Sequence, residues 1–182
     1  TVDQAKRIIG LGVEKVAISA AAVADPKLIS AIAQEVGSQS VVVVLDVKSS
    51  LFGKQEVWTH NGRKNSGKSP VEAAQEAEAL GAGEIVINSI DRDGQMKGYD
   101  LALAKKVREA TRLPMSVLGG AGSLQDIGDL ISAIISFLAV ALVVDGALIT
   151  ETLAASLVKT KKSRPLKGRS QRHALAARQQ RL

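Results

Sequence analysis

The chain has 182 residues, of which 46% are apolar and only four are aromatic, and its formal net charge is +6. Because it has no cysteine, a disulfide framework, a zinc–thiolate site and a cysteine nucleophile are all excluded. Residues 159–182 carry nine of the 24 basic residues and no acidic one, so the rest of the chain is slightly acidic.

No export signal follows Thr1, and the lack of cysteine suits a reducing compartment, so a cytoplasmic location is expected. The longest apolar run, residues 131–144, is shorter than the roughly 20 residues of a membrane-spanning helix. We therefore expect this run to be buried in the protein core, and no membrane association.

Short β-rich runs and capped helical patterns alternate from the start of the chain. "KVAIS", residues 15–19, predicts a strand. Residues 25–37 predict a helix with Asp25 as N-cap and Pro26 at its first position. "VVVVLDVK", residues 41–48, is a continuous apolar run typical of a strand buried on both faces.

The pattern continues after a small hairpin that we predict for residues 51–67. Ser69 and Glu72 form a capping-box pattern at the start of the next helix. The remaining predicted elements are a strand at 84–90, a helix at 100–111, and a strand followed by a glycine turn and a helix start at 113–123.

Buried strands joined by helical crossovers indicate a parallel α/β sheet. The segments "LGVEKVAIS" and "LGAGEIVIN" resemble each other at a distance of about 70 residues, and repeated βα units favour a barrel over an open doubly wound sheet. We take residues 1–150 as one barrel-like domain and 151–182 as a basic tail, disordered or foreign to the fold.

Polar residues and glycines cluster where the predicted strands end, which is where α/β proteins place their sites. They are Ser19, Asp46, Asp91, Asp93, Gly119 and Gly120.

Asp46 lies near the end of a strand that is predicted to be buried. Burial favours the neutral, proton-donating form of a carboxyl group, which is the form that a general acid needs. The alternative is that Asp46 braces the following loop. In "SIDRDG", Asp91 and Asp93 share a face if the chain is extended and then hold a polar substrate. Alternatively, this segment is a turn at Asp93-Gly94 in which Arg92 neutralises its neighbours.

The turn "LGGAGS", residues 118–123, leads into a helix whose N-terminal N–H groups suit a phosphate, although such turns also merely connect elements. His60 and His173 are isolated from each other in the sequence, so no metal site is predicted.

Five segments together resemble the cyclase subunit of imidazole glycerol phosphate synthase, over residues 1 to about 130. They are "KVAISAAAV", "QSVVVVLDVK", "THNGRKNSG", "GAGEIVINSIDRDGQMKGYD" and "LGGAGS". "LFGK", "MKGYD" and Leu118 are more similar to paralogues from O-antigen and lipopolysaccharide gene clusters. This resemblance implies a (β/α)8 TIM barrel of the ribulose-phosphate-binding type that takes ammonia from a glutaminase partner, with no cofactor.

The resemblance also implies a role for each matching residue. Asp46 matches the catalytic general acid, and Asn88 matches a substrate contact. Asp93, Gly94 and Gly120 match phosphate-binding loops. At the opposite end of the barrel, Lys15 and Glu84 match two members of a charged ammonia gate, and Glu14 lies near the glutaminase interface. The expected substrate is a phosphorylated ribotide or, for the paralogues, a nucleotide-linked sugar.

The chain also departs from the family. Its match starts after the third strand, so the first strands, the general base and the other gate charges are absent. Ser19 and Ala20 replace an Asn-Thr pair that helps to bind a phosphate, and Ala141 and Leu142 replace the small-residue loop expected near the eighth strand.

Three functions therefore stay open. The first is an ammonia-using cyclase or amidating enzyme. The second is a catalytically incompetent barrel fragment whose exposed sheet edges invite self-association. The third, which we consider the weakest, is nucleic-acid binding by the basic tail, because that tail has no aromatic residue for stacking on bases.

Overall fold

The computed structural model describes residues 1–50 and 53–144 of the chain. The chain divides into two units, Thr1–Leu138 and Ala139–Leu182, and the first of these holds all the strands described below. The predicted basic tail at 151–182, including His173, lies outside the described residues.

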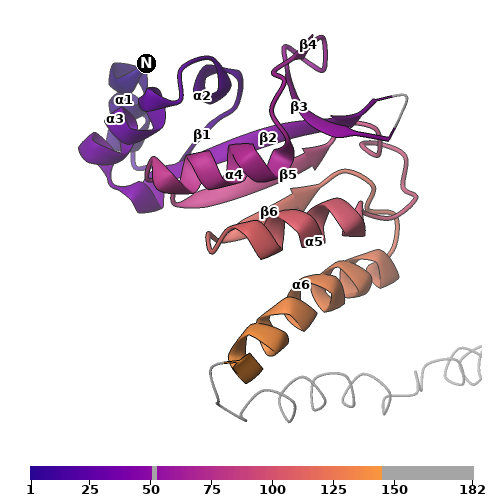
Figure 1. Cartoon of the computed structure of the whole chain (residues 1–182). Helices are drawn as coiled ribbons and strands as arrows, with labels where there is room; N and C mark the ends of the chain where they lie inside the picture. Colours follow the sequence, from indigo (N-terminus) through magenta and orange to yellow (C-terminus); the bar gives the residue numbers. More distant parts are fainter. Residues whose placement is uncertain (51–52, 145–182) are drawn as a thin grey trace, which may run out of the picture. The chain divides into compact units, whose positions relative to one another are not determined.

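Helices and strands alternate along the first unit, as predicted (Figure 1). The elements are α1 (Val2–Gly10), β1 (Val16–Ile18), α2 (Ala20–Ala24), α3 (Lys27–Val36), the 3-10 turn η1 (Ser38–Ser40), β2 (Val41–Ser49), β3 (Gln55–Thr59), β4 (Lys64–Asn65), α4 (Pro70–Ala79), β5 (Glu84–Ser89), α5 (Leu101–Ala110), β6 (Met115–Leu118) and α6 (Leu124–Val144).

The strands form one sheet, in which β1, β2, β5 and β6 are neighbours in that order and all parallel. The parallel α/β sheet predicted from the sequence is thus confirmed. β3 and β4 add an antiparallel hairpin to the carboxyl end of β2, which confirms the predicted hairpin. His60 and Asn61 at its tip have positive φ angles of 54° and 58°, a conformation that asparagine tolerates in tight turns.

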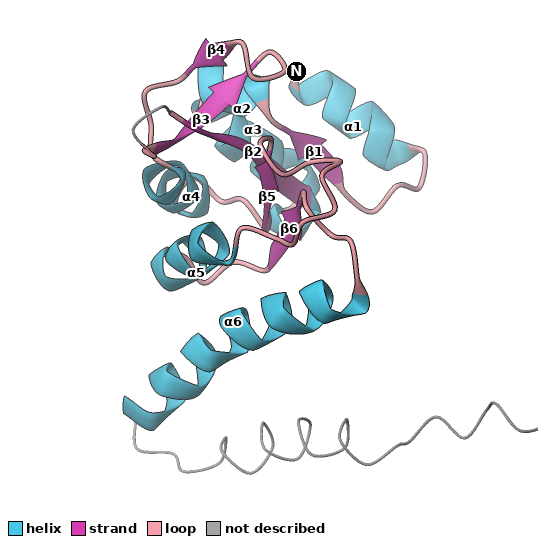
Figure 2. Cartoon of the chain, turned by 90° about the vertical axis from the view of Figure 1, so that its right-hand side faces the viewer, coloured by secondary structure: helices cyan, strands magenta, loops and turns pink. Residues whose placement is uncertain are grey.

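Helices pack against one face of the sheet, with α4 and α5 together on one side of the strands (Figure 2). Residues that point to this side form the core with the helices and are almost fully buried. From the strands they include Val43, Leu45, Ile85 and Ile87, and from the helices Ile29, Ile32, Ala74, Ala77, Leu103 and Val107. A doubly wound sheet would carry helices on both faces, so this arrangement favours a segment of a barrel wall.

The opposite face, here called the open face, carries the alternate strand residues, which are mostly only partly buried. Val44, for example, is partly buried although it lies within the apolar run, so the prediction of a strand buried on both faces holds only for its first three residues. β1 and β6 are the edges of the parallel strands. A groove of about 580 Å³ lies beside β1 and is lined by residues of α1 and β1.

Local sequence signals explain most of the helix starts. Ser69 and Glu72 make the predicted capping box of α4, and Asp100 caps α5 through the Leu103 N–H. α3 begins at Lys27 rather than at Pro26, and the Asp25 carboxylate accepts from the Lys27 N–H. Two helices are not anticipated from the sequence: α1, whose capping box joins Thr1 and Gln4, and the short α2.

The prediction that residues 131–144 are buried core is wrong for the side chains that the structure describes. The segment belongs to α6, where an eighth strand was sought, and Ile131 is 50% exposed and Ile135 42% exposed. In the described part of the chain these two side chains are only partly covered, so they remain open to solvent. In the same part of the chain, no helix is long and apolar enough to cross a membrane.

We expect Ile85→Ala to destabilise the chain by about 2–5 kcal/mol, because it empties a fully buried position between β5 and the helices. Urea unfolding followed by circular dichroism measures this loss. Ile127→Ala, at a site that is 42% exposed, is the matched control and should change the free energy of unfolding by no more than about 0.5 kcal/mol. Equal losses for the two variants would contradict the assignment of the core.

Candidate functional site

Asp46 lies in β2 near the carboxyl edge of the sheet, and both of its carboxylate oxygens accept hydrogen bonds. Ser19 Oγ donates to Oδ2 at 3.1 Å, and Asn88 Nδ2 donates to Oδ1 at 2.7 Å. All three side chains are partly buried. The carboxylate thus joins β2 to β5 and to the end of β1, and it keeps further lone pairs for a ligand.

Lys15 and Glu84 form an ion pair at the opposite, amino-terminal edge, with Lys15 Nζ 2.5 Å from Glu84 Oε2. Lys15 directly precedes β1 and Glu84 opens β5, so these residues meet across the end of β2. The lysine and the Ser116 hydroxyl, in that order of effect, hold the pKa of the Glu84 carboxyl below its usual range. Glu14, which is predicted to lie near a glutaminase interface, is exposed and directly precedes Lys15 in the sequence.

The two polar groups lie on the same open face of the sheet. The Cα partners Val42–Glu84, Val44–Val86 and Asp46–Asn88 follow one another between β2 and β5, so their side chains share one face. Asn88 lies four positions after Glu84, which corresponds to about 13 Å along a strand. Valine side chains occupy the space between the ion pair and Asp46.

Residues 90–95 form a tight turn, so the prediction that Asp91 and Asp93 share one face of an extended chain is wrong. The N–H groups of Arg92 and Asp93 both donate to the Ser89 carbonyl, which closes the turn. Asp91 instead braces the end of β2, where its Oδ2 accepts from the Ser49 N–H at 2.7 Å.

Arg92 does not neutralise its neighbours in the described structure; its guanidinium donates to the Gly98 carbonyl at 3.1 Å. Among the described residues, the Asp93 carboxylate has no hydrogen-bond or ion-pair partner. Asp93 and Gly94 thus remain at the carboxyl edge with polar groups free for a ligand.

Gly119 and Gly120 allow the loop after β6 to pack directly on the turn after β5. A Cβ atom on Gly119 would lie 2.5 Å from the Ser89 carbonyl oxygen, and one on Gly120 would lie 2.2 Å from that of Gly98. The Gly98 N–H donates to the Gly120 carbonyl at 2.8 Å. The two predicted phosphate loops therefore form one backbone-lined surface.

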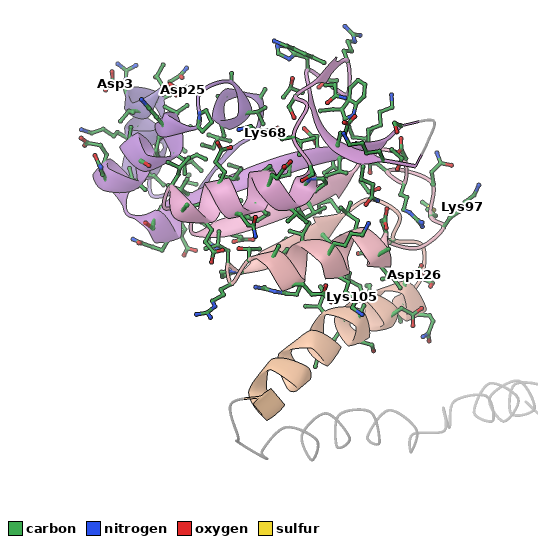
Figure 3. The ribbon with its side chains drawn as sticks, viewed as in Figure 1. Asp3, Asp25, Lys68, Lys97, Lys105 and Asp126 are labelled. Carbon is green, nitrogen blue, oxygen red and sulfur yellow. The ribbon has the colours of Figure 1, made fainter. Side chains whose placement is uncertain are left out.

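The N-terminus of α6 is partly capped, so two of the N–H groups predicted to be unpaired there already have a partner. Asp126 Oδ2 accepts from the N–H groups of Gly122 at 3.0 Å and Ser123 at 2.7 Å, because an aspartate three residues after the N-cap folds back onto it. Figure 3 shows Asp126 at the start of α6, near the loop that carries Lys97.

Sequence reasoning missed two neighbours of these groups. Trp58 on β3 is the Cα partner of Asp46 and faces the same side of the sheet, with the Lys48 ammonium 5.1 Å from its ring centroid. Ser116 on β6 donates to Glu84 Oε1 at 2.9 Å. Strand pairing brings these residues together over long sequence distances, so no local sequence pattern predicts their contacts. In residues 1–50 and 53–144 no group of side chains suited to hold a metal ion was found.

We expect Lys15→Met to destabilise the chain by less than about 1 kcal/mol at pH 7, because the lysine end of the pair is exposed to solvent. Glu84 has a lowered folded-state pKa, so its contribution is present above the unfolded pKa of about 4.3 and is lost as the pH falls through the folded value. The difference in unfolding free energy between wild type and variant should therefore shrink between pH 5 and pH 3, as urea unfolding at each pH would measure.

Lys105→Met is the control for this experiment, since Lys105 and Glu109 are 3.9 Å apart on the surface of α5. If the difference in unfolding free energy between wild type and Lys15→Met stayed constant with pH, this result would contradict the ion pair.

Comparison with known proteins connects this arrangement to one family. The model for the family described as "Histidine biosynthesis protein" matches residues 1–152. A Leptospira interrogans protein, provisionally named imidazole glycerol phosphate synthase subunit HisF, is 52% identical over 130 residues, which are 71% of this chain and 51% of that protein. The imidazole glycerol phosphate synthase subunit HisF of Alkaliphilus metalliredigens is 43% identical over 129 residues, again 71% of this chain and 51% of the relative.

The chain therefore spans about half the length of the curated relatives that it matches. The match also confirms the predicted partial TIM barrel, since a parallel sheet with helices on one face is the wall of such a barrel. With a family model matching most of its length, this chain belongs to the histidine biosynthesis protein family.

Proposed function

We propose that this chain supplies the ammonia-using half of a HisF-type cyclase, which acts on a phosphorylated ribotide in the cytoplasm together with a glutaminase partner. The observation that carries the proposal is the open face of the sheet. It holds Asp46 between two polar partners at one edge and the Lys15–Glu84 ion pair at the other, with valines between them.

Asp46 is the group that we propose to move a proton at the reacting atoms. Its hydrogen bonds from Ser19 and Asn88 fix the orientation of the carboxylate, so that the same oxygens meet each substrate molecule. An approach from the open face leaves Asp46 within reach of a ligand that also contacts Asn88.

The phosphate group of the substrate is proposed to lie on the surface formed by the two glycine loops. Gly94, Gly119 and Gly120 all have positive φ angles, between 71° and 100°, and at Gly119 and Gly120 the backbone of the neighbouring loop fills the space that a side chain would take. Asp93, whose carboxylate is free in the described structure, is proposed to accept from a substrate hydroxyl or a protonated phosphate.

Ammonia is proposed to enter at the edge marked by Lys15 and Glu84. From there the path to Asp46 crosses about 13 Å of valine-lined sheet face. The valine side chains of this strip offer ammonia no hydrogen-bond partner. The charged pair, which closes one end of this strip, then acts as the entrance.

A nucleotide-linked sugar is the alternative substrate, as in the paralogues of O-antigen gene clusters. The feature that favours it is Leu118, which is 50% exposed and is the Cα partner of Asn88 on the open face. Calorimetric titration with each substrate class distinguishes the two, because only the true class should release heat at micromolar concentration.

A catalytically incompetent fragment is the third candidate, supported by the open sheet face and the groove beside β1. The family's general base is expected in strands that the matched half lacks. Light scattering tests this candidate, since a clean monomer at high concentration would count against self-association through free sheet edges.

We expect Asp46→Asn to lower ammonia-dependent turnover of the ribotide by about 100-fold or more, because the amide cannot donate or accept a proton as the carboxyl group does. Turnover is measured with ammonium salt after the chain is mixed with a separately produced N-terminal half of the Alkaliphilus metalliredigens relative. The affinity for the ribotide, measured by calorimetry, should change only a few-fold.

Asp25→Asn is the matched control, because that carboxylate accepts from the Lys27 N–H and has no bond to Ser19, Asp46 or Asn88 among the described contacts, and it should leave turnover unchanged. A folded mixture that binds the ribotide but shows no turnover, or an Asp46→Asn variant as active as wild type, would contradict the proposed role.

A further inference from the structure

Glu84 is held by two partners, one on each carboxylate oxygen. Lys15 Nζ lies 2.5 Å from Oε2, and Ser116 Oγ donates to Oε1 at 2.9 Å. Hydrogen bonds to an ionised group are stronger and more directional than neutral ones, so both contacts constrain the same side chain. The lysine alone would leave the carboxylate free to rotate about its terminal bond.

Strand pairing places the three residues on different strands but on one face. Lys15 precedes β1, Glu84 opens β5, and Ser116 is the second residue of β6. Ser116 is the Cα partner of Val86, which lies two residues after Glu84 and so faces the same side. The contacts link the start of β1 to β5 and β6 across the amino-terminal end of β2.

Ser116 stands among apolar residues on this face. Its neighbours along the open face are Val44 and Val86, and Leu118 follows it on β6. Neither burial nor strand propensity explains a serine there, because its side chain is exposed and serine is not a strong strand former. Its hydroxyl does have a specific partner, the Glu84 carboxylate.

We infer that Ser116 is a positioning residue that fixes the Glu84 carboxylate in the orientation in which it meets Lys15. The functional meaning rests on the proposed function, in which this pair is the ammonia entrance. The serine hydroxyl then determines how strongly Lys15 and Glu84 are held together at this entrance. The lowered pKa of Glu84, to which the serine contributes after the lysine, agrees with this geometry.

The test is an NMR pH titration of the Glu84 side-chain carboxyl in the 182-residue chain. Ser116→Val removes the hydroxyl while keeping a strand-forming side chain, and we expect it to raise the pKa of Glu84. Ser116→Thr restores a hydroxyl and should return the pKa to the wild-type value. Lys15→Met should raise it more than Ser116→Val, because the lysine is the larger of the two influences.

A merely structural role for Ser116 predicts a different result, namely a changed melting temperature with an unchanged Glu84 pKa in Ser116→Val. That result, with Lys15→Met still raising the pKa, would overturn the inference and leave the ion pair intact. If the valine variant does not fold, Ser116→Ala gives the same comparison. The titration does not depend on turnover, so a failure of the proposed function would appear in the Asp46 experiment and not here.

Discussion

The pairing register between β2 and β5 is the constraint on which the site depends. In this register Asp46 is opposite Asn88 and Val42 is opposite Glu84, so the open face receives the polar residues of both edges. The alternate residues, such as Leu45 and Ile87, are almost fully buried against the helices. A slip of one residue would expose these apolar side chains and turn Asp46 toward the helices, so core packing fixes the site.

Backbone proximity is the second requirement, and it concerns the loops at the carboxyl edge. The turn after β5 and the loop after β6 approach so closely that side chains at Gly119 and Gly120 would collide with carbonyl groups. The contact is reinforced by the bond from the Gly98 N–H to the Gly120 carbonyl. Glycine is thus required here for contact between two loops as well as for any contact with an anion.

Much of this fold follows from local sequence patterns. The β-branched runs located β1, β2 and β5, and the Ser69–Glu72 pattern located the start of α4. α1 was overlooked although Thr1 and Gln4 carry a capping-box pattern of the same kind. The apolar run on α6 is the exception, because its length distinguishes a buried segment from a membrane span without showing what covers the segment.

The site was predictable in outline but not in its contacts. Parallel strands bring their carboxyl ends to one edge of the sheet, and this alone predicts that Ser19 and Asp46 lie near each other. The hydrogen bonds of Asp46, however, join residues 27 and 42 positions away in the sequence. Likewise, the contact of Ser116 with Glu84 depends on a side-chain direction that composition and spacing do not specify. The capping of α6 by Asp126 differs, because the spacing of Ser123 and Asp126 is a local pattern that could have predicted it.

The proposed function requires the open face to bind a phosphorylated ribotide at its carboxyl edge. Chemical-shift mapping of the ¹⁵N-labelled chain during titration with that ribotide tests this claim most directly. The account predicts that shifts gather at Ser19, Asp46, Asn88, Gly94 and Gly120, while Lys15, Glu84 and Ser116 at the opposite edge stay unchanged. Shifts confined to other surfaces, or no shifts in a folded sample, would contradict it.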